Sequence, residues 1–455
     1  MSIEKLDSSL SLVSIFRVLS QDPGTVFLDS SSMGYDLGRY SILACYPVKT
    51  FYATLKEAFF VEEGRRFYCD GDPFEMLREE LCKTRLESEE LVPFVGGAIG
   101  YISYDYWGLI EKRPRSQILD PDQPLVRFGF YDMALVFDHE ADKSYFVGFD
   151  LYPGFESRKR KLLKLTESAG DRRLQREAFE SDKPRSNFST NEYFNAIGKA
   201  RDYIREGEVY QINLSQRFSS SFNGSPASIY ERLRKINPAP YSAYLNFGDE
   251  CILSSSPERF MWLRNGVLET RPIKGTRPRG SSAEEERANC ESLRSAEKDK
   301  AELLMIVDLE RNDLGKVCKP GSITVEGLFS LETYAQVIHQ TGRIRGNLAS
   351  QFDAVDCLQA MFPGGSITGA PKIRAMEVID ELEPSTRGVY TGSIGYFGFD
   401  GNADFNIAIR TMRISEKTLS FNVGGGIVWD SDPKSEYEET FDKASALFEA
   451  LGHSR

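Results

Sequence analysis

Short apolar runs alternate with turn residues along the first third of the chain. The segments TVFLDSSS, RYSILACYPV, GGAIGYISYDYW and MALVFDHEADKSYFVGF have the length and residue content of strands and hairpins. A charged stretch follows from Glu156, and its first part, ESRKRKLLKLTESAG, has a helical pattern. Pro184 and Asn187 then mark a surface linker. We therefore expect a boundary near residue 185, between an N-terminal subdomain (1–185) and a catalytic region (186–455).

The second region opens with the helical pattern TNEYFNAIGKARDYIREGE, for which Thr190 is the expected N-cap and Gly207 the expected stop. Strand patterns follow in VYQINLSQRF, SAYLNF and CILSSSPERFMWLRNGVLETRPI. Further helices are expected around 283–315 and 351–362, and a last one in SEYEETFDKASALFEAL. Strands and helices mix without a regular β-α-β rhythm, which favours an α+β fold over a Rossmann-type fold.

Composition narrows the classes of function. The 455 residues carry a formal net charge of −12, which argues against a nucleic-acid binder and against a protein of anionic membrane surfaces. The N-terminal sequence lacks the pattern of a signal peptide, and no run approaches the about 18 apolar residues of a membrane helix. We expect a cytoplasmic protein.

Cysteine and histidine usage bounds the metal chemistry. Seven scattered cysteines, none in a C-x-x-C pair, indicate reduced thiols and no zinc site. Only three histidines are present, so a metal site would be built mainly from carboxylates. Oxygen ligands of this kind favour a hard ion such as Mg²⁺.

One predicted hairpin brings a carboxylate near a lysine. The Asn-Gly dipeptide at 265–266 is the strongest short signal for a two-residue turn. Counting back from this turn sets Glu258 opposite Ile273, and therefore close to Lys274. The pair is a proton-exchanging couple or a plain salt bridge, and the hairpin alone favours the salt bridge.

Two predicted helices each carry spaced carboxylates. Asp299 and Glu302 stand at i and i+3, and Glu436, Glu439 and Lys443 form a stripe at i, i+3 and i+7. Each group alone is typical of a solvated helix face, with a Glu–Lys ion pair worth a few tenths of a kcal/mol. Together they allow a second interpretation, in which two helices share one Mg²⁺.

Glycine-rich segments and one arginine complete the candidates. FPGGSITGAPK fails the phosphate-loop pattern, because Ala-Pro-Lys follows Gly369 where Gly-Lys-Ser/Thr is needed, so an NTPase is disfavoured. Gly424–Gly426 follow a predicted strand and offer bare amides to an anion, or simply form a bend. Arg410, at the end of the apolar strand pattern ADFNIAIR, suits a carboxylate fork or a structural ion pair.

The motifs gain specificity from their order along the chain. SPERF, RPIKGTRPRG, AELLMIVDLERNDLG, FPGGSITGAPK, YTGSIGY, AIRTM, GGGIV and EYEETFDKA together resemble the chorismate-utilising enzymes. This family includes component I of anthranilate synthase and of aminodeoxychorismate synthase, and the isochorismate and salicylate synthases. The resemblance is dense from about residue 190 to 452. It implies two antiparallel β-sheets packed in a sandwich with flanking helices.

Two positions separate the branches of this family. Anthranilate and isochorismate synthases typically have alanine where this chain has Lys274, and the lysine form resembles aminodeoxychorismate synthase component I. Gln211 replaces the lysine base of isochorismate and salicylate synthases. The resemblance therefore implies conversion of chorismate and ammonia to 4-amino-4-deoxychorismate, on the way to 4-aminobenzoate and folate. Anthranilate synthase component I is the alternative, and a non-catalytic binding subunit is a third possibility.

The resemblance also implies roles for the candidate residues. Lys274 would attack C2 of chorismate as a neutral amine, with Glu258 as the general acid for the departing C4 hydroxyl. Mg²⁺ would be held by Glu302, Glu436 and Glu439, with Asp299 nearby. His339 would lie near the substrate ring. Carboxylates of the substrate would be bound by a further set: Ser366, Tyr390, Arg410, Gly424, Gly425, Gly426 and Lys443.

Partners follow from the same resemblance. A separate glutamine amidotransferase subunit would supply ammonia, since this chain shows no glutaminase segment. Free ammonium would replace that subunit in vitro. The segments RYSILACYP and NPAPYSAYLNF match the positions that hold a tryptophan effector in related chains.

Overall fold

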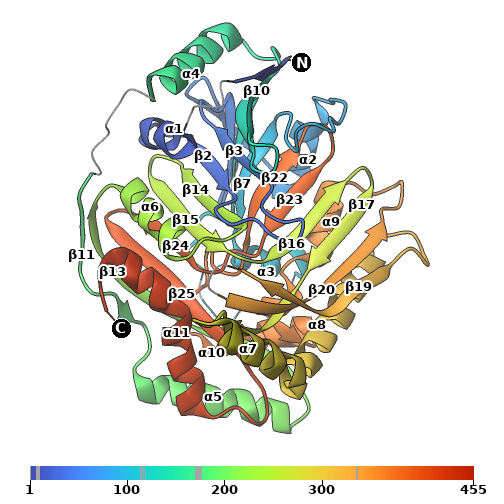
Figure 1. The fold of residues 1–455 in the computed structure, drawn as a ribbon. Helices are drawn as coiled ribbons and strands as arrows, with labels where there is room; N and C mark the ends of the chain where they lie inside the picture. Colours follow the sequence, from blue (N-terminus) through green and yellow to red (C-terminus); the bar gives the residue numbers. More distant parts are fainter. Residues whose placement is uncertain are drawn as a thin grey trace.

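The computed structural model describes residues 2–6, 11–112, 115, 117, 119–169, 177–334 and 337–454. Within them, two large antiparallel β-sheets form the centre of the molecule (Figure 1). The first sheet contains, in spatial order, β1 (Ser2–Lys5), β10 (Lys143–Gly148), β9 (Met133–Asp138), β3 (Tyr40–Ala44), β2 (Val26–Asp29), β14 (Tyr241–Asn246), β15 (Glu250–Ser256), β24 (Thr411–Ser415), β25 (Thr418–Ile427), β13 (Gln211–Gly224) and β11 (Phe179–Ser181), with β12 (Arg185–Ser186) and β21 (Gly369–Ala370) also paired to β13.

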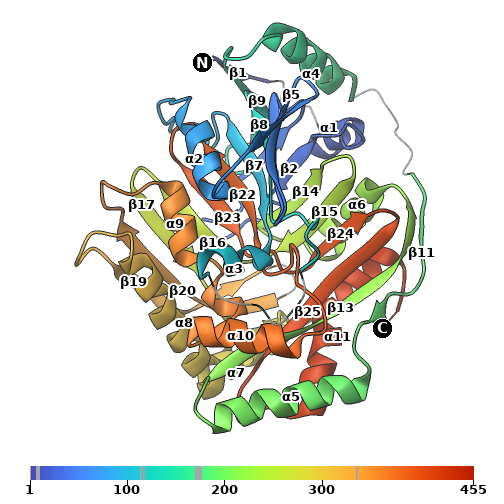
Figure 2. The ribbon, with the colours of Figure 1, turned by 180° about the vertical axis from the view of Figure 1, so that it is seen from behind.

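The second sheet lies beside the first, on the left in Figure 2. Its spatial order is β18 (Ile273–Pro278), β20 (Val337–Asn347), β17 (Val267–Arg271), β16 (Arg259–Arg264), β23 (Ala403–Asn406), β22 (Ser393–Gly398), β7 (Gly97–Ile102), β8 (Val126–Tyr131), β4 (Lys49–Ala53), β5 (Ala58–Glu62) and β6 (Arg65–Cys69), with β19 (Thr324–Thr333) paired to β20. Apolar residues of both sheets, among them Ile42, Leu245, Ile99 and Ile394, share one buried cluster between them. The predicted α+β sandwich is therefore confirmed.

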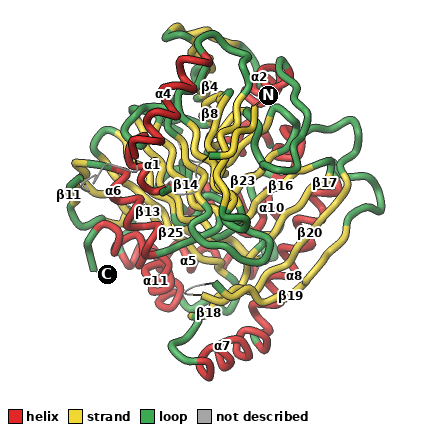
Figure 3. Tube along the Cα trace, turned by 45° about the horizontal axis from the view of Figure 1, so that its top comes forward, coloured by secondary structure: helices red, strands yellow, loops and turns green. Residues whose placement is uncertain are grey.

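Helices cover the outer faces of both sheets. The first sheet is covered by α1 (Leu12–Leu19), α4 (Phe155–Ala169), α5 (Thr190–Arg205), α6 (Pro226–Ile236), α10 (Lys372–Leu382) and α11 (Pro433–Leu451). The second is covered by α2 (Pro73–Cys82), α3 (Trp107–Ile110), α7 (Ala283–Ser295), α8 (Glu297–Gly315) and α9 (Ala354–Met361). Figure 3 separates α4, α1, α6 and α11 on one side from α7 and α8 beside β18–β20 on the other. No helix in the described part of the chain combines the length and the apolar character needed to cross a membrane.

Each sheet joins strands from both sides of residue 185. In the first sheet β2 pairs with β14, and in the second β7 pairs with β22. The two sequence regions thus share both cores, and the boundary near residue 185 stays a prediction about chain segments.

The chain crosses between the two sheets at two neighbouring places. Residues 257–258 connect β15 to β16, and residues 407–410 connect β23 to β24. The crossings are bonded to each other, because the Ile407 amide donates to the Glu258 carbonyl at 3.0 Å and the Ser256 hydroxyl donates to the Ile407 carbonyl at 2.6 Å. The prediction that a strand extends to Arg410 is therefore wrong: β23 ends at Asn406, and Arg410 lies in the crossing with a φ of 50°.

Two local predictions need correction by one residue, the N-cap of α5 and the register of the hairpin. The N-cap of α5 is Ser189 and not Thr190, because Ser189 and Glu192 form a reciprocal capping box. In the hairpin, Asn265 and Gly266 both have positive φ as predicted, but an irregularity between Arg259 and Trp262 sets Arg259 opposite Arg271. The predicted pairing of Glu258 with Ile273 is therefore displaced.

The glycine run lies inside a strand and not after it. Gly424–Gly426 belong to β25 and pair with Asn213–Leu214–Ser215 of β13. A Cβ built on Gly424 would come 2.5 Å from the Leu214 carbonyl oxygen, so this close approach requires glycine.

Candidate functional site

Lys274 stands at the start of β18, just after Pro272 ends the β17 ladder. Its Nζ donates to the Ser366 carbonyl oxygen at 3.1 Å. The residue keeps some contact with solvent, but protein atoms surround the amine, and this burial lowers the pKa of Lys274. The Lys443 ammonium adds to that effect, while the Glu302 and Glu258 carboxylates oppose it. The amine is thereby shifted toward the neutral, nucleophilic form.

Glu258, in the first crossing, is the acid beside this lysine. Its side chain is 4% exposed, and Oε1 accepts the Ile273 amide at 3.3 Å. Burial raises the pKa of Glu258, while the Ser366 hydroxyl and Lys274 act in the opposite direction. Lys274 and Glu258 thus move toward each other in pKa, which is the condition for proton exchange at neutral pH.

The α11 stripe meets the glycine run of β25. The Ser431 hydroxyl donates to Glu436 Oε1 at 2.6 Å, and Lys443 Nζ donates to Glu439 Oε1 at 2.7 Å and to the Gly424 carbonyl at 3.0 Å. A Cβ on Gly425 would lie 3.4 Å from Glu436 Oε2, 3.6 Å from Lys443 Nζ and 3.8 Å from Glu439 Oε1. The missing side chain therefore leaves a cradle that two carboxylates and one ammonium share.

Electrostatics distinguish the two carboxylates of this cradle. Burial, and then the neighbouring Glu439 charge, raise the pKa of Glu436. Burial also opposes ionisation of Glu439, but the Lys443 ammonium outweighs it and lowers the pKa of Glu439. The cradle therefore carries two carboxylates that repel each other.

The α8 pair is divided between two tasks. Asp299 accepts a hydrogen bond from Arg277 Nη2 at 3.1 Å. The half-buried Glu302 instead acts on Lys274, because its negative charge favours the protonated amine. In the described part of the chain, no three acidic, histidine or cysteine side chains converge closely enough to hold a metal ion as they stand. Glu436 and Glu439 nevertheless fit a hard divalent ion, because they present carboxylate oxygens over the bare Cα of Gly425.

Arg410 and His339 line a cavity of about 20 Å³ together with Asn237, Pro257 and Tyr334. Arg410 Nη1 donates to Asn237 Oδ1 at 3.0 Å, and Thr276 Oγ1 lies 2.8 Å from His339 Nδ1. Burial, aided by the Arg410 charge, lowers the pKa of His339 to about 3, so the ring is neutral.

Tyr390 and Ser366 are also buried. Burial raises the pKa of Tyr390, which keeps its phenol protonated. The structure thus gathers most of the predicted residues around Lys274 and the two crossings. Sequence reasoning missed Asn237 and Thr276, which hold Arg410 and His339. Their signal was weak, since each is a small polar residue inside a motif chosen for other reasons.

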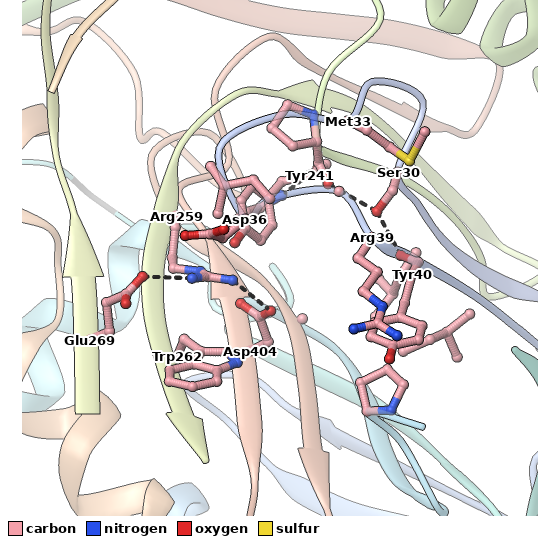
Figure 4. Close-up of a pocket in the computed structure, with 18 of the residues that line it drawn as sticks. Ser30, Met33, Asp36, Arg39, Tyr40, Tyr241, Arg259, Trp262, Glu269 and Asp404 are labelled. Carbon is pink, nitrogen blue, oxygen red and sulfur yellow. Dashed lines mark hydrogen bonds and ion pairs between the residues drawn. The ribbon is translucent and has the colours of Figure 1, made fainter. Parts of the chain in front are cut away.

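A larger cavity, of about 750 Å³, is lined in part by residues of β16 (Figure 4). It is formed by the β2–β3 segment and the NPAPY segment, at the place predicted for an effector. Arg259 is a central polar residue of the cavity lining. Its Nη1 donates to Glu269 Oε1 at 2.6 Å, and its Nη2 donates to Asp404 Oδ2 at 3.5 Å. Further lining residues include Ser30, Met33, Asp36, Arg39, Tyr40, Tyr241 and Trp262.

Comparison with known proteins gives consistent results. The family model described as chorismate binding enzyme matches residues 28–449. Aminodeoxychorismate synthase component 1 of Klebsiella aerogenes is 37% identical over 439 residues, covering 96% of this chain and 95% of that protein. Anthranilate synthase component 1 of Aquifex aeolicus is also 37% identical, over 467 residues, covering 98% and 93%.

A solved structure agrees with the fold. Anthranilate synthase component I from Streptococcus pneumoniae matches with a TM-score of 0.77 and 35% identity, covering 91% of this chain and 93% of that one. The family match spans both sheets, both crossings and the Lys274 site. On this evidence the chain belongs to the family of chorismate-binding enzymes.

Proposed function

We propose that this enzyme converts chorismate and ammonia to 4-amino-4-deoxychorismate, for 4-aminobenzoate and folate synthesis. One observation carries the proposal: a buried lysine with a lowered pKa stands beside a buried glutamate with a raised pKa. Overall identity supports either branch, since relatives named aminodeoxychorismate synthase and anthranilate synthase match equally well. Lys274 favours the first, and anthranilate synthase component I is the second candidate.

The reaction consists of two allylic displacements. The Lys274 lone pair forms a bond to C2, both double bonds of the conjugated ring diene shift toward C4, and the C4 hydroxyl departs as water with the proton of Glu258. Ammonia then forms the C4–N bond, both double bonds shift back, and the C2–N bond to Lys274 breaks, which returns the lysine to its neutral amine. Glu258 regains a proton from the incoming nitrogen, so each turnover releases one water. The Ser366 carbonyl, which accepts the Lys274 amine, orients its lone pair.

Substrate carboxylates need compensating charge and donors. We assign the binding of these carboxylates to Arg410, Tyr390, Lys443 and the amides of Gly424–Gly426. Ser366, in the neighbouring loop, completes this set. Neutral His339 lies beside Arg410 and is held by Thr276. The arginine is not locked in an ion pair in the described residues, so its guanidinium is available to an anionic ligand.

Magnesium belongs to the same proposal. Glu302, Glu436 and Glu439 would hold the ion, with Asp299 nearby. When bound, Mg²⁺ would neutralise the ring carboxylate and withdraw electron density from the ring. The α11 carboxylates prepare this site by repulsion, and Lys443 stabilises Glu439 in its charged form.

Two partners complete the proposal. The names of the relatives designate a component 1, which supports a second subunit that delivers ammonia from glutamine. The cavity of about 750 Å³ is our candidate site for tryptophan or a similar effector.

A product assay tests the proposed function. The protein is incubated with chorismate, Mg²⁺ and ammonium at alkaline pH, and the product is identified by mass spectrometry. We expect aminodeoxychorismate without release of pyruvate. Anthranilate together with pyruvate would establish the second candidate, and unchanged chorismate would exclude both.

A further inference from the structure

Arg387 is a buried arginine whose N–H groups are all used inside the protein. Its side chain is 1% exposed. Nε and Nη2 donate to the carboxylate oxygens of Glu383 at 3.0 and 2.7 Å. Nη1 donates to the Ile367 carbonyl at 3.0 Å and to Thr391 Oγ1 at 3.3 Å, and Nη2 also donates to the Asn213 carbonyl. These bonds use every N–H donor of the guanidinium group, so Arg387 has none left for a substrate.

The first segment that Arg387 holds is the loop in contact with Lys274. Ile367 is the last residue of the short 3₁₀ helix η2 (Gly365–Ile367). The residue before it, Ser366, accepts the Lys274 amine through its carbonyl at 3.1 Å. The two carbonyls belong to consecutive planar peptide groups, so a hydrogen bond that fixes one of them limits the rotation of the other. Arg387 therefore acts, one peptide group away, on the carbonyl that orients the Lys274 amine.

The other two segments adjoin residues that we assign to the substrate. Thr391 Oγ1, which accepts from Arg387, donates to the Tyr390 carbonyl at 2.6 Å, and the guanidinium carbon lies 5.8 Å from the centre of the Tyr390 ring. Asn213, on β13, pairs with Gly426 of the glycine run. One guanidinium group thus joins three segments that are far apart in the sequence.

Glu383 fixes Arg387 in turn. It follows the last residue of α10 and is 4% exposed. Besides the bonds from Arg387, its Oε1 accepts the Ser215 amide at 2.7 Å and the Ser215 hydroxyl at 2.9 Å. Ser215 lies on β13 and pairs with Gly424, so the ion pair is anchored to the strand behind the glycine run. Apolar residues of similar volume often stabilise a fold as well as a buried ion pair does, so the geometry that this pair sets is the better explanation for it.

We propose that Arg387, held by Glu383, is a positioning residue that fixes the Ser366 carbonyl against the Lys274 amine. A displacement of about 1 Å can cost about 10²-fold in rate, so a loop that is free to rotate would lower kcat in a chain that still folds. The inference rests on the proposed function for the use of Lys274 as the nucleophile, whereas the fixing of the loop does not depend on it.

The test is a double variant of the full chain, Arg387→Met with Glu383→Gln. It leaves no buried charge unpaired, and the glutamine still accepts the Ser215 amide. We expect kcat to fall by about 10²-fold, with KM for chorismate within about threefold of wild type, because Arg410 and Lys443 keep their own contacts. A wild-type kcat, or a raised KM with unchanged kcat, would refute the role at Lys274.

A second ion pair of the same chemistry is the matched control. Arg17 of α1 donates to Glu231 of α6 at 2.6 Å, and neither residue belongs to the site. The double variant Arg17→Met with Glu231→Gln should keep the wild-type kcat. An equal loss of kcat in the two double variants would mean that both act through general stability, and would overturn the proposal.

Arg387→Lys keeps the positive charge and removes the planar fork. Lysine can still pair with Glu383, but its single nitrogen cannot also donate to both Ile367 and Thr391 in the same geometry. We expect a folded protein whose kcat is at least about tenfold lower. If the double variant at 387 and 383 does not fold, Arg387→Lys decides the question by itself. A wild-type kcat in Arg387→Lys would show that charge alone suffices, and the positioning role would be wrong.

Hydrogen–deuterium exchange gives a readout that needs no activity. In Arg387→Lys and in the double variant, amides of residues 364–370 should exchange about tenfold faster than in wild type, while those of β15 keep their protection. A uniform increase along the chain would refute the positioning role. If wild type makes no aminodeoxychorismate but the variants show the local increase, the proposed function fails and the fixing of the loop by Arg387 stands.

Discussion

Glu258 and Arg259 are neighbours in the sequence, but they lie at two different sites in the structure. Glu258 faces the Lys274 site, where burial raises its pKa and no arginine pairs with it among the described residues. Arg259 faces the cavity of Figure 4, between Glu269 and Asp404. Burial alone would lower the pKa of Arg259, but Tyr241 and these two acids raise it.

The difference lies in charge compensation. Glu269 is further paired with Arg345 at 2.6 Å, so the wall of the larger cavity is a closed ion-pair network. At the Lys274 site the amine and the acid form no ion pair among the described residues, and burial shifts the pKa of each. Perturbed, unpaired groups are an indicator of a reactive site.

The sharpest way to break this comparison is Lys274→Ala. We expect the rate of aminodeoxychorismate formation to fall by at least about 10⁴-fold, because the nucleophile is gone. Mass spectrometry of wild type with chorismate, without ammonia, should detect a covalent adduct that the variant lacks. Lys300→Ala, an exposed lysine of α8, is the control. A variant that retains the wild-type rate would refute the nucleophile assignment.

Glu258→Gln should have the next largest effect. Loss of the general acid should lower kcat by about 10²–10⁴-fold with little change in KM. The wild-type rate should increase with pH as the Lys274 amine loses its proton. Because the pKa of Lys274 is lowered, the midpoint of this increase should lie below the usual pKa range of a lysine. Steady-state rates from pH 6 to pH 10 measure both. An acid limb at the pKa of a free lysine would contradict the buried amine.

Arg259→Met tests the other cavity through stability. It removes the ion-pair partner of the half-buried Asp404 and one of the partners of the buried Glu269, which keeps Arg345, so the free energy of unfolding should fall by about 2–3 kcal/mol. Urea unfolding measures this loss. Arg311→Met removes an exposed ion pair and should cost less than about 1 kcal/mol. Equal losses in the two variants would mean that the network is not the structural element described above.

Gly425→Ala should have the smallest effect. The new methyl group fits without a clash, at 3.4–3.8 Å from the oxygens and nitrogen of the cradle. It crowds the place assigned to the cation, so half-activation should need about tenfold more Mg²⁺. Titration of the rate with Mg²⁺ measures this. Gly198→Ala, on α5 with open space around it, is the matched control, and an unchanged titration in Gly425→Ala would place the ion elsewhere.

Much of the local structure could be predicted from the sequence. The Asn265–Gly266 turn and the helices that carry Glu302 and Glu436 form where expected, because turn chemistry and helix periodicity are local. The α5 cap was placed one residue late, since Ser189 and Thr190 are both good caps and only the backbone decides between them. The crossing at Arg410 was missed because an apolar alternating pattern does not show that a strand changes sheet.

The sequence by itself determined which chemical groups are present and how they are spaced: a lysine after a hairpin, carboxylates at i and i+3, and glycines where backbones approach closely. Only the tertiary structure decided which of these groups lie together and which of them are protonated. Lys274, Ser366 and Glu258 lie close together because the chain passes from one sheet to the other at two neighbouring crossings. The pKa of each group depends on how much water that packing removes and which charges it brings near, and neither quantity is a property of a local stretch of chain.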